Sequence, residues 1–256
     1  MLVTYSRIPP EQLYNVSGEG FAGGLSRLLV DLNWPVALFA IAIVGVLLER
    51  GAPRVPAAVA IALCALMPFV VHQSDLDARP VNVLPALGVA IAVALTITAR
   101  PVLRLAHRQP WDRLRIVVAA IVVAAGIEWV FAELGFYAGS PFYTRPVPPG
   151  EDLAAVHFGH HHGLDGVMFV LAALLLSRVA RSGPVRAYVA LMFAYGLANA
   201  VQDFWSEQLV KRGWLDTKLP SVLLPTVSFA WLLILVSAAA LWLITPRPRA
   251  PEPHRR

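Results

Sequence analysis

The sequence contains a single cysteine and few charged residues. Cys64 is the only cysteine among 256 residues, which excludes an intramolecular disulfide and any metal cluster built on several thiolates. Charged residues make up 14% of the chain, whereas about a quarter is usual in globular proteins. This shortage argues against an ordinary water-exposed surface.

Apolar residues in long runs take the place of the missing charges. They make up 57% of the chain, and the mean hydropathy is +0.63. Seven stretches reach or approach the roughly 20 helical residues that cross a hydrocarbon core. The second and third are short, and each contains a proline. We therefore expect an all-α, polytopic membrane helix bundle of about seven transmembrane helices, at about 34–49, 54–71, 82–98, 114–136, 164–180, 184–205 and 220–245.

The distribution of basic residues gives this bundle an orientation. When loops are assigned to alternate sides, 14 of the 21 Lys and Arg residues fall on the side that holds loops 50–54, 100–115 and 178–186 and the C-terminal tail. Because positive residues favour the cytoplasmic side, the N-terminus is predicted outside and the C-terminus in the cytoplasm of a plasma or inner membrane. This orientation explains the net charge of +5 without a nucleic-acid partner.

The chain divides into three parts. Residues 1–33 form an outer lead-in, in which Phe21, Leu25, Leu28 and Leu29 have the spacing of a short interfacial helix. Residues 34–245 form the membrane domain, and residues 246–256 a disordered basic tail near anionic headgroups. The connection at 137–163 is much longer than a typical bundle loop, which suggests that it has a use.

That long connection ends in a histidine cluster. His157, His160, His161 and His162 occupy six positions, and Asp165 follows. If the segment is helical, the first three histidines share a face with Asp165, while His162 lies three residues from it. Imidazole both ligates transition metals and moves protons near neutral pH. The pattern fits a metal or proton-transfer site, and equally a polar loop at the start of a helix.

Further polar groups fall in the outer halves of other stretches. Asn199, Gln202, Asp203, Ser206 and Glu207 follow one stripe of the sixth stretch, Glu128 lies inside the fourth, and His72 follows the second. Ionisable groups at membrane depth are costly unless they face a cavity or one another. We therefore expect one outward-facing pocket of histidines and carboxylates.

The segment His157-Phe-Gly-His160-His161 resembles the His-x-x-His-His box of membrane desaturases and hydroxylases. In that family the box is one of several that bind two irons, and the other boxes are absent here. Seven spans with an outside N-terminus are also similar to rhodopsins and to membrane ceramidase-type hydrolases. The seventh stretch, however, has neither the lysine of the former nor the paired histidines of the latter.

Three functional hypotheses follow. The first is a membrane enzyme that binds iron, copper or zinc through members of His157, His160, His161, His162 and Asp165 and acts on a lipid or isoprenoid-like substrate. His72, Asp203 and Glu207 are the candidates to complete its ligand set. The second is a metal-free cyclase, isomerase or hydratase with Glu128 as proton donor and Asp203 as base or charge stabiliser. The third is a non-catalytic binding protein, transporter or complex subunit. In all three, the partners are membrane lipids or a lipophilic small molecule.

Overall fold

The computed structural model describes residues 29, 32–70, 79–99, 108–127, 129, 162–210, 213–223 and 225–249, with the backbone alone for Leu32, Glu207 and Gln208. Over these residues the fold is all-α and contains no strand, which confirms the predicted class. The elements in chain order are η1 (Leu32–Val36), α4 (Ala37–Leu48), α5 (Arg54–Ala65), α6 (Met67–Val70), η2 (Pro80–Asn82), α7 (Val83–Thr98), α8 (Asp112–Ala125), α10 (His162–Leu176), α11 (Gly183–Phe204), η4 (Trp205–Val210) and α12 (Phe229–Ile244).

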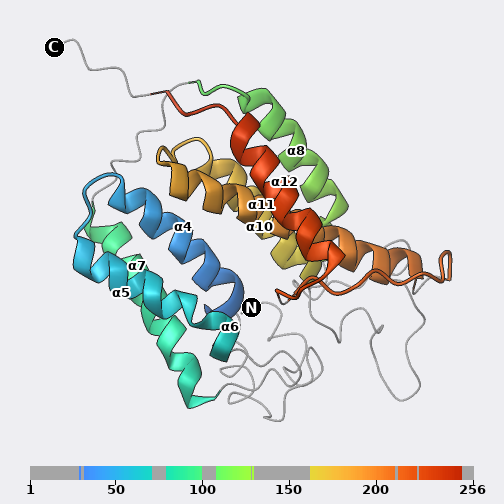
Figure 1. Ribbon diagram of the computed structural model, residues 1–256, viewed down its shortest axis with the longest axis horizontal. Helices are drawn as coiled ribbons and strands as arrows, with labels where there is room; N and C mark the ends of the chain where they lie inside the picture. The colour runs from blue at the N-terminus through green and yellow to red at the C-terminus, as the bar shows by residue number, and fades with distance from the viewer. Residues whose placement is uncertain are drawn as a thin grey trace.

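The helices form two groups, α4 to α7 on one side and α8 to α12 on the other (Figure 1). Helix α4 joins them because it packs on α5 and α7 and also on α10 and α11. Small residues allow close packing in the first group: a Cβ atom on Gly88 of α7 would lie 2.8 Å from Cys64 Sγ of α5.

The closest helix pair of the second group is α10 and α11. A Cβ atom on Gly166 would lie 2.5 Å from the backbone nitrogen of Ala200, so glycine is required at this crossing. Phe169 and Val170 of α10 are fully buried. The α10–α11 pair therefore forms a rigid centre on which α4, α8 and α12 pack.

Most of the apolar helices in the described part of the chain are shorter than a membrane crossing. Among the described residues, only the helix Pro80–Thr98 is both long and apolar enough to cross a bilayer. The other apolar helices, at Asn33–Leu48, Arg54–Val70, His162–Leu176 and Phe229–Ile244, have 10 to 17 residues. At about 1.5 Å per residue they fall short of a core of about 30 Å. The described helices thus leave the predicted seven-span bundle unsupported.

One predicted stretch was wrong in extent, and another contains a break. Helix α12 begins at Phe229 rather than near residue 220, because Pro220 and Pro225 precede it and Ser228 caps it by accepting a hydrogen bond from the backbone of Trp231. The second stretch is broken at Leu66, just before Pro68, into α5 and α6. The stretch 82–98, predicted as short, is the one that belongs to the long helix.

The predicted division into three parts is largely outside the described residues. The lead-in is described only at Leu29, Leu32 and Asn33, and the tail only up to Arg249. The segment from Thr245 to Arg249 is not helical. The division, the interfacial helix and the disordered tail therefore stay predictions.

Candidate functional site

Three predicted site residues are described with their side chains. His162 and Asp165 lie in the first turn of α10, and Asp203 lies in the last turn of α11. For Glu207 the structure describes the backbone alone, in η4. The remaining members lie outside the described residues: Glu128, His72, His157, His160 and His161.

The start of α10 and the end of α11 meet at Asp203. The backbone N–H of Gly163 donates a hydrogen bond to Asp203 Oδ2 over 3.1 Å, and Asp203 is buried. The first N–H groups of a helix have no partner within it, and a carboxylate there is stabilised by the helix dipole. This contact brings the end of the histidine cluster and the polar stripe of α11 to one place, which we call the junction: His162, Gly163, Asn199 and Asp203.

Aromatic side chains cover the junction. The rings of Trp34 and His162 meet edge to face with centroids 5.4 Å apart, and Trp34 also contacts the buried ring of Phe169. Trp129 is buried, and a Cβ atom on Gly163 would overlap its indole ring. The sequence segment next to Glu128 therefore reaches the junction, although Glu128 itself is outside the described residues.

Buried polar atoms near the junction that have no hydrogen-bond partner among the described residues include the acceptor Oδ1 of Asn199 and the donor Nε1 of Trp129. The other end of the Asn199 amide donates to the carbonyl oxygen of Tyr195 over 2.9 Å. An unsatisfied buried polar group costs roughly 1–3 kcal/mol, so such atoms mark places where a bound polar group would be favourable.

An apolar cavity of about 240 Å³ adjoins the junction. It shares Trp34 and Tyr195 with the surroundings of His162 and Asn199. The Tyr195 hydroxyl donates to the carbonyl oxygen of Leu223 over 2.9 Å and thereby ties α11 to the segment before α12. The lining is otherwise almost entirely apolar: Leu38, Met67, Pro68, Tyr188, Leu191, Met192, Leu223, Pro225 and Trp231.

A buried amide pair holds the neighbouring helix starts together. Asn82 Nδ2 donates to Asn33 Oδ1 over 2.9 Å, and Asn33 Nδ2 donates to the carbonyl oxygen of Asn82 over 2.8 Å. Both side chains are buried. The pair fixes the starts of α4 and α7 beside the cavity. With the junction, it makes up what we call the histidine end of the bundle.

A metal site does not form within the described residues alone. They contain no group of three or more His, Cys, Asp or Glu side chains that could hold a metal ion. Four of the predicted ligands, His72, His157, His160 and His161, lie outside them. The metal centre therefore stays a prediction.

No family model, curated protein or solved structure matches this chain. The functional argument therefore depends on the geometry of the chain itself. Sequence reasoning found Asp203 and His162 but missed Trp34, Trp129 and Asn82. Tyr195 could have been found, because it continues the Asn199 and Asp203 stripe by one helical turn.

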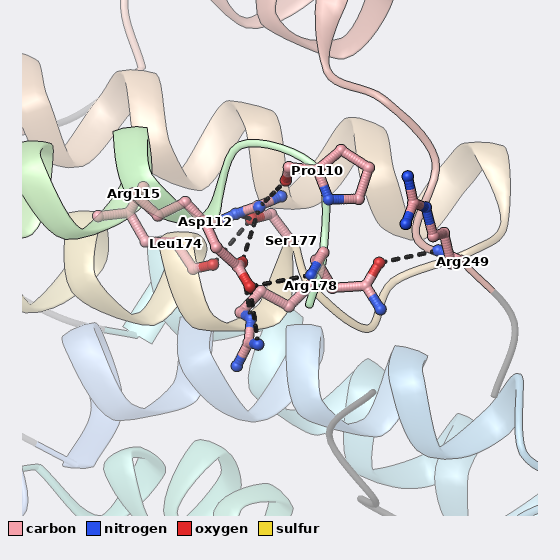
Figure 2. A network of polar contacts seen from close by, with 8 residues as sticks. Pro110, Asp112, Arg115, Leu174, Ser177, Arg178 and Arg249 are labelled. Carbon is pink, nitrogen blue, oxygen red and sulfur yellow. Dashed lines mark hydrogen bonds and ion pairs between the residues drawn. The ribbon is translucent and has the colours of Figure 1, made fainter. Parts of the chain in front are cut away.

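The opposite end of the bundle holds a network of paired charges (Figure 2). Arg178 binds Asp112 through two hydrogen bonds of 3.0 Å, and Arg115 binds Asp112, Ser177 and the carbonyl oxygen of Pro110. Burial by itself raises the pKa of Asp112. Hydrogen bonds from the Gln109 N–H and from Arg178, with the charges of both arginines, outweigh it and hold the pKa below its usual 3.8.

Glu49 extends this network to α4. Its carboxylate accepts hydrogen bonds from the backbone N–H groups of Arg181 and Ser182, at 2.8 and 2.7 Å. The N–H of Arg249 in turn donates to Gln109 Oε1 over 2.8 Å. Contacts thus connect all four basic segments that the charge distribution assigns to one side. We call this region, with the ends of α4, α10 and α12 and the starts of α8 and α11, the arginine end.

Proposed function

We propose that the chain is an integral membrane enzyme that acts on a lipophilic molecule at the histidine end. The observation that carries the proposal is the hydrogen bond between Gly163 and Asp203, which joins a buried carboxylate to the helix start that holds His162. Trp34, which lines the apolar cavity, contacts the ring of that histidine. Concave apolar sites with a few convergent polar groups are the usual form of small-molecule sites.

The surface of the bundle supports a membrane location. The outward faces of α7, α8 and α12 carry exposed large apolar side chains, among them Ile97, Ile116 and Leu243. A contiguous apolar exterior of this kind suits lipid better than water. The gathering of the basic segments at one end supports the predicted orientation, with that end in the cytoplasm and the histidine end outside.

The cavity indicates the class of substrate. Its lining of Leu, Met, Pro and aromatic residues offers an apolar wall for a lipid or isoprenoid-like chain. The polar end of that molecule would lie where Trp34 and Tyr195 meet the junction. Asn199 Oδ1, one helical turn from Tyr195, offers a buried acceptor to that polar end.

The reaction itself divides into two versions. In the metal-assisted version, His162 and Asp165 act with His157, His160 and His161, and the metal supplies a Lewis acid or activates water or oxygen. In the metal-free version, Asp203 acts as base or stabilises positive charge, and Glu128 donates the proton. Of the two acid-base residues of the second version, the structure describes Asp203, and its side chain is buried.

Comparison of lipid extracts tests the proposal. Cells that lack the protein, or produce the wild type, Asp203→Asn or the exposed control Asp216→Asn, are compared by mass spectrometry. We expect one lipophilic product to fall at least about 100-fold in Asp203→Asn, because proton-transfer groups contribute that much, and to be unchanged in Asp216→Asn. Unchanged extracts in every strain would favour a non-catalytic binding or transport role.

Metal analysis separates the two versions. A stoichiometric metal that is lost in a His160→Ala, His161→Ala double variant, with activity lost to chelators, supports the metal-assisted version. Activity that survives chelators but is lost in Glu128→Gln supports the metal-free version. If Glu128→Gln lowers only the unfolding temperature, the glutamate is structural.

A further inference from the structure

A second cavity, of about 180 Å³, lies toward the arginine end between α8, α10, α11 and α12. Helix α8 packs on α10 and helix α12 packs on α11, so the four helices line one crevice. Away from the helix ends its lining is apolar, with Val118 of α8 and Phe193 of α11. The inner part therefore suits an alkyl chain.

The lining changes character toward the helix ends. Two tryptophans, Trp111 and Trp242, and two arginines, Arg115 and Arg186, line the cavity there. Both tryptophan side chains are partly exposed. Tryptophan is typical of the headgroup level of a bilayer, and arginine binds phosphate through a planar fork of N–H donors. The apolar inner part of the cavity thus suits the acyl chain of a phospholipid, and its entrance of arginine and tryptophan suits the phosphate headgroup.

The arginine end has positive charge in excess of its acidic partners. Asp112 is shared by Arg178 and Arg115. Arg186 donates from Nη2 to the carbonyl oxygens of Trp242 and Thr245, and no acidic side chain among the described residues pairs with it. A bound anion would supply the counter-charge that this arginine lacks.

We propose that this cavity binds an anionic phospholipid, with one acyl chain against Val118 and Phe193 and the phosphate at Arg186 and Arg115. Basic pockets between helices on the cytoplasmic side are known to bind anionic headgroups. The inference shares only the membrane location with the proposed function. The site is distinct from the histidine end, since it lies at the opposite ends of α10 and α11.

Lipid-dependent thermal unfolding tests the inference. The full chain in detergent is titrated with dioleoylphosphatidylglycerol, with dioleoylphosphatidylcholine, which has the same acyl chains, and with inorganic phosphate. We expect the anionic lipid to raise the unfolding temperature about 5 °C more than the zwitterionic lipid does, and phosphate alone to have no effect.

Variants test whether the preference for the anionic lipid over the zwitterionic lipid arises at this cavity. Arg186→Gln should weaken the apparent affinity for the anionic lipid about tenfold or more, because a charge-assisted contact is lost. Arg186→Lys keeps the positive charge but lacks the planar fork of N–H donors. Its apparent affinity for the anionic lipid should lie between those of the wild type and Arg186→Gln. Val118→Trp fills the cavity and should reduce stabilisation by the anionic lipid. The matched control Arg113→Gln removes an exposed arginine of the same end that does not line the cavity, and should behave as the wild type.

For each variant, the unfolding temperature with the anionic lipid is compared with that of the same variant with the zwitterionic lipid. A change in the stability of the lipid-free variant therefore cancels. Equal stabilisation by the two lipids in the wild type would overturn the inference. So would an unchanged preference in Arg186→Gln, or an equal loss in Arg113→Gln, which would indicate general surface electrostatics. Inorganic phosphate matching the anionic lipid would show a soluble-anion site instead. None of these results depends on whether the histidine end is catalytic.

Discussion

The two ends of the bundle use polar residues in opposite ways. At the arginine end, Asp112 and Arg178 are partly exposed, paired with each other and supported by neighbouring hydrogen bonds. At the histidine end, Asn199 and Asp203 are buried, and Asp203 accepts a hydrogen bond from the backbone N–H of Gly163. Paired charges at a rim connect helices at modest cost, whereas a single buried polar group is expensive and is most often kept for function. The contrast fits the proposal that the histidine end carries the chemistry and the arginine end holds the helices together.

Glycine substitutions give the largest expected difference between the ends. Gly163→Ala would push a Cβ atom into the buried ring of Trp129, whereas Gly183→Ala at the start of α11 meets open space. We expect the first to lower the free energy of unfolding by about 3 kcal/mol and the second to change it by less than about 1 kcal/mol. Thermal unfolding followed by circular dichroism measures both. Equal effects would mean that the junction is not tightly packed.

Substitutions in the Asn33–Asn82 pair at the histidine end should give the second-largest change in the free energy of unfolding. Asn82→Ala leaves Oδ1 of Asn33 without its present donor in a buried site, while Asn33 Nδ2 keeps the backbone carbonyl of residue 82, so we expect a loss of about 2 kcal/mol in the free energy of unfolding. The double variant with Asn33→Ala should cost less than the sum of the two single variants, since it leaves no orphaned amide. Denaturant unfolding of the three variants checks this. Strict additivity would argue against the pair.

Substitution at the arginine end should lower the free energy of unfolding by less, and the size of the effect should depend on pH. Asp112→Asn removes a partly exposed ion pair, so we expect a loss of about 1 kcal/mol at neutral pH. Because the folded-state pKa of Asp112 lies below 3.8, its contribution is present above that pH and is lost as the pH falls through the folded pKa. Wild type and variant should therefore converge in unfolding temperature as the pH falls below 3.8 and through the folded pKa. A constant difference at all pH values would contradict the pairing.

The helical class and the location of the basic residues could be predicted from sequence because both depend on composition along the chain. The charge distribution groups the segments that hold Arg50, Arg113 and Arg178 together without any knowledge of packing, and the structure brings these segments to one end. Helix ends could not be predicted as well. They depend on local breaks such as Pro68 and Pro225, which a count of apolar residues passes over.

The candidate site was predictable only in part, for a different reason. Asp203 is conspicuous as a carboxylate in an apolar stretch, and His162 belongs to a visible cluster. Trp34 and Trp129 look like ordinary apolar residues until tertiary packing brings them against His162 and Gly163. The cavity is likewise a product of packing between distant helices and has no sequence signature.

Photolabelling tests the central claim most directly. A lipophilic probe that carries an alkyl diazirine is photolysed with the full chain in bilayers, and the modified peptides are identified by mass spectrometry. If the cavity beside the junction holds a lipophilic molecule, saturable labelling will appear at its lining residues Met67, Met192 and Trp231. Labelling confined to the outward faces of α8 and α12, and never saturating, would contradict the account.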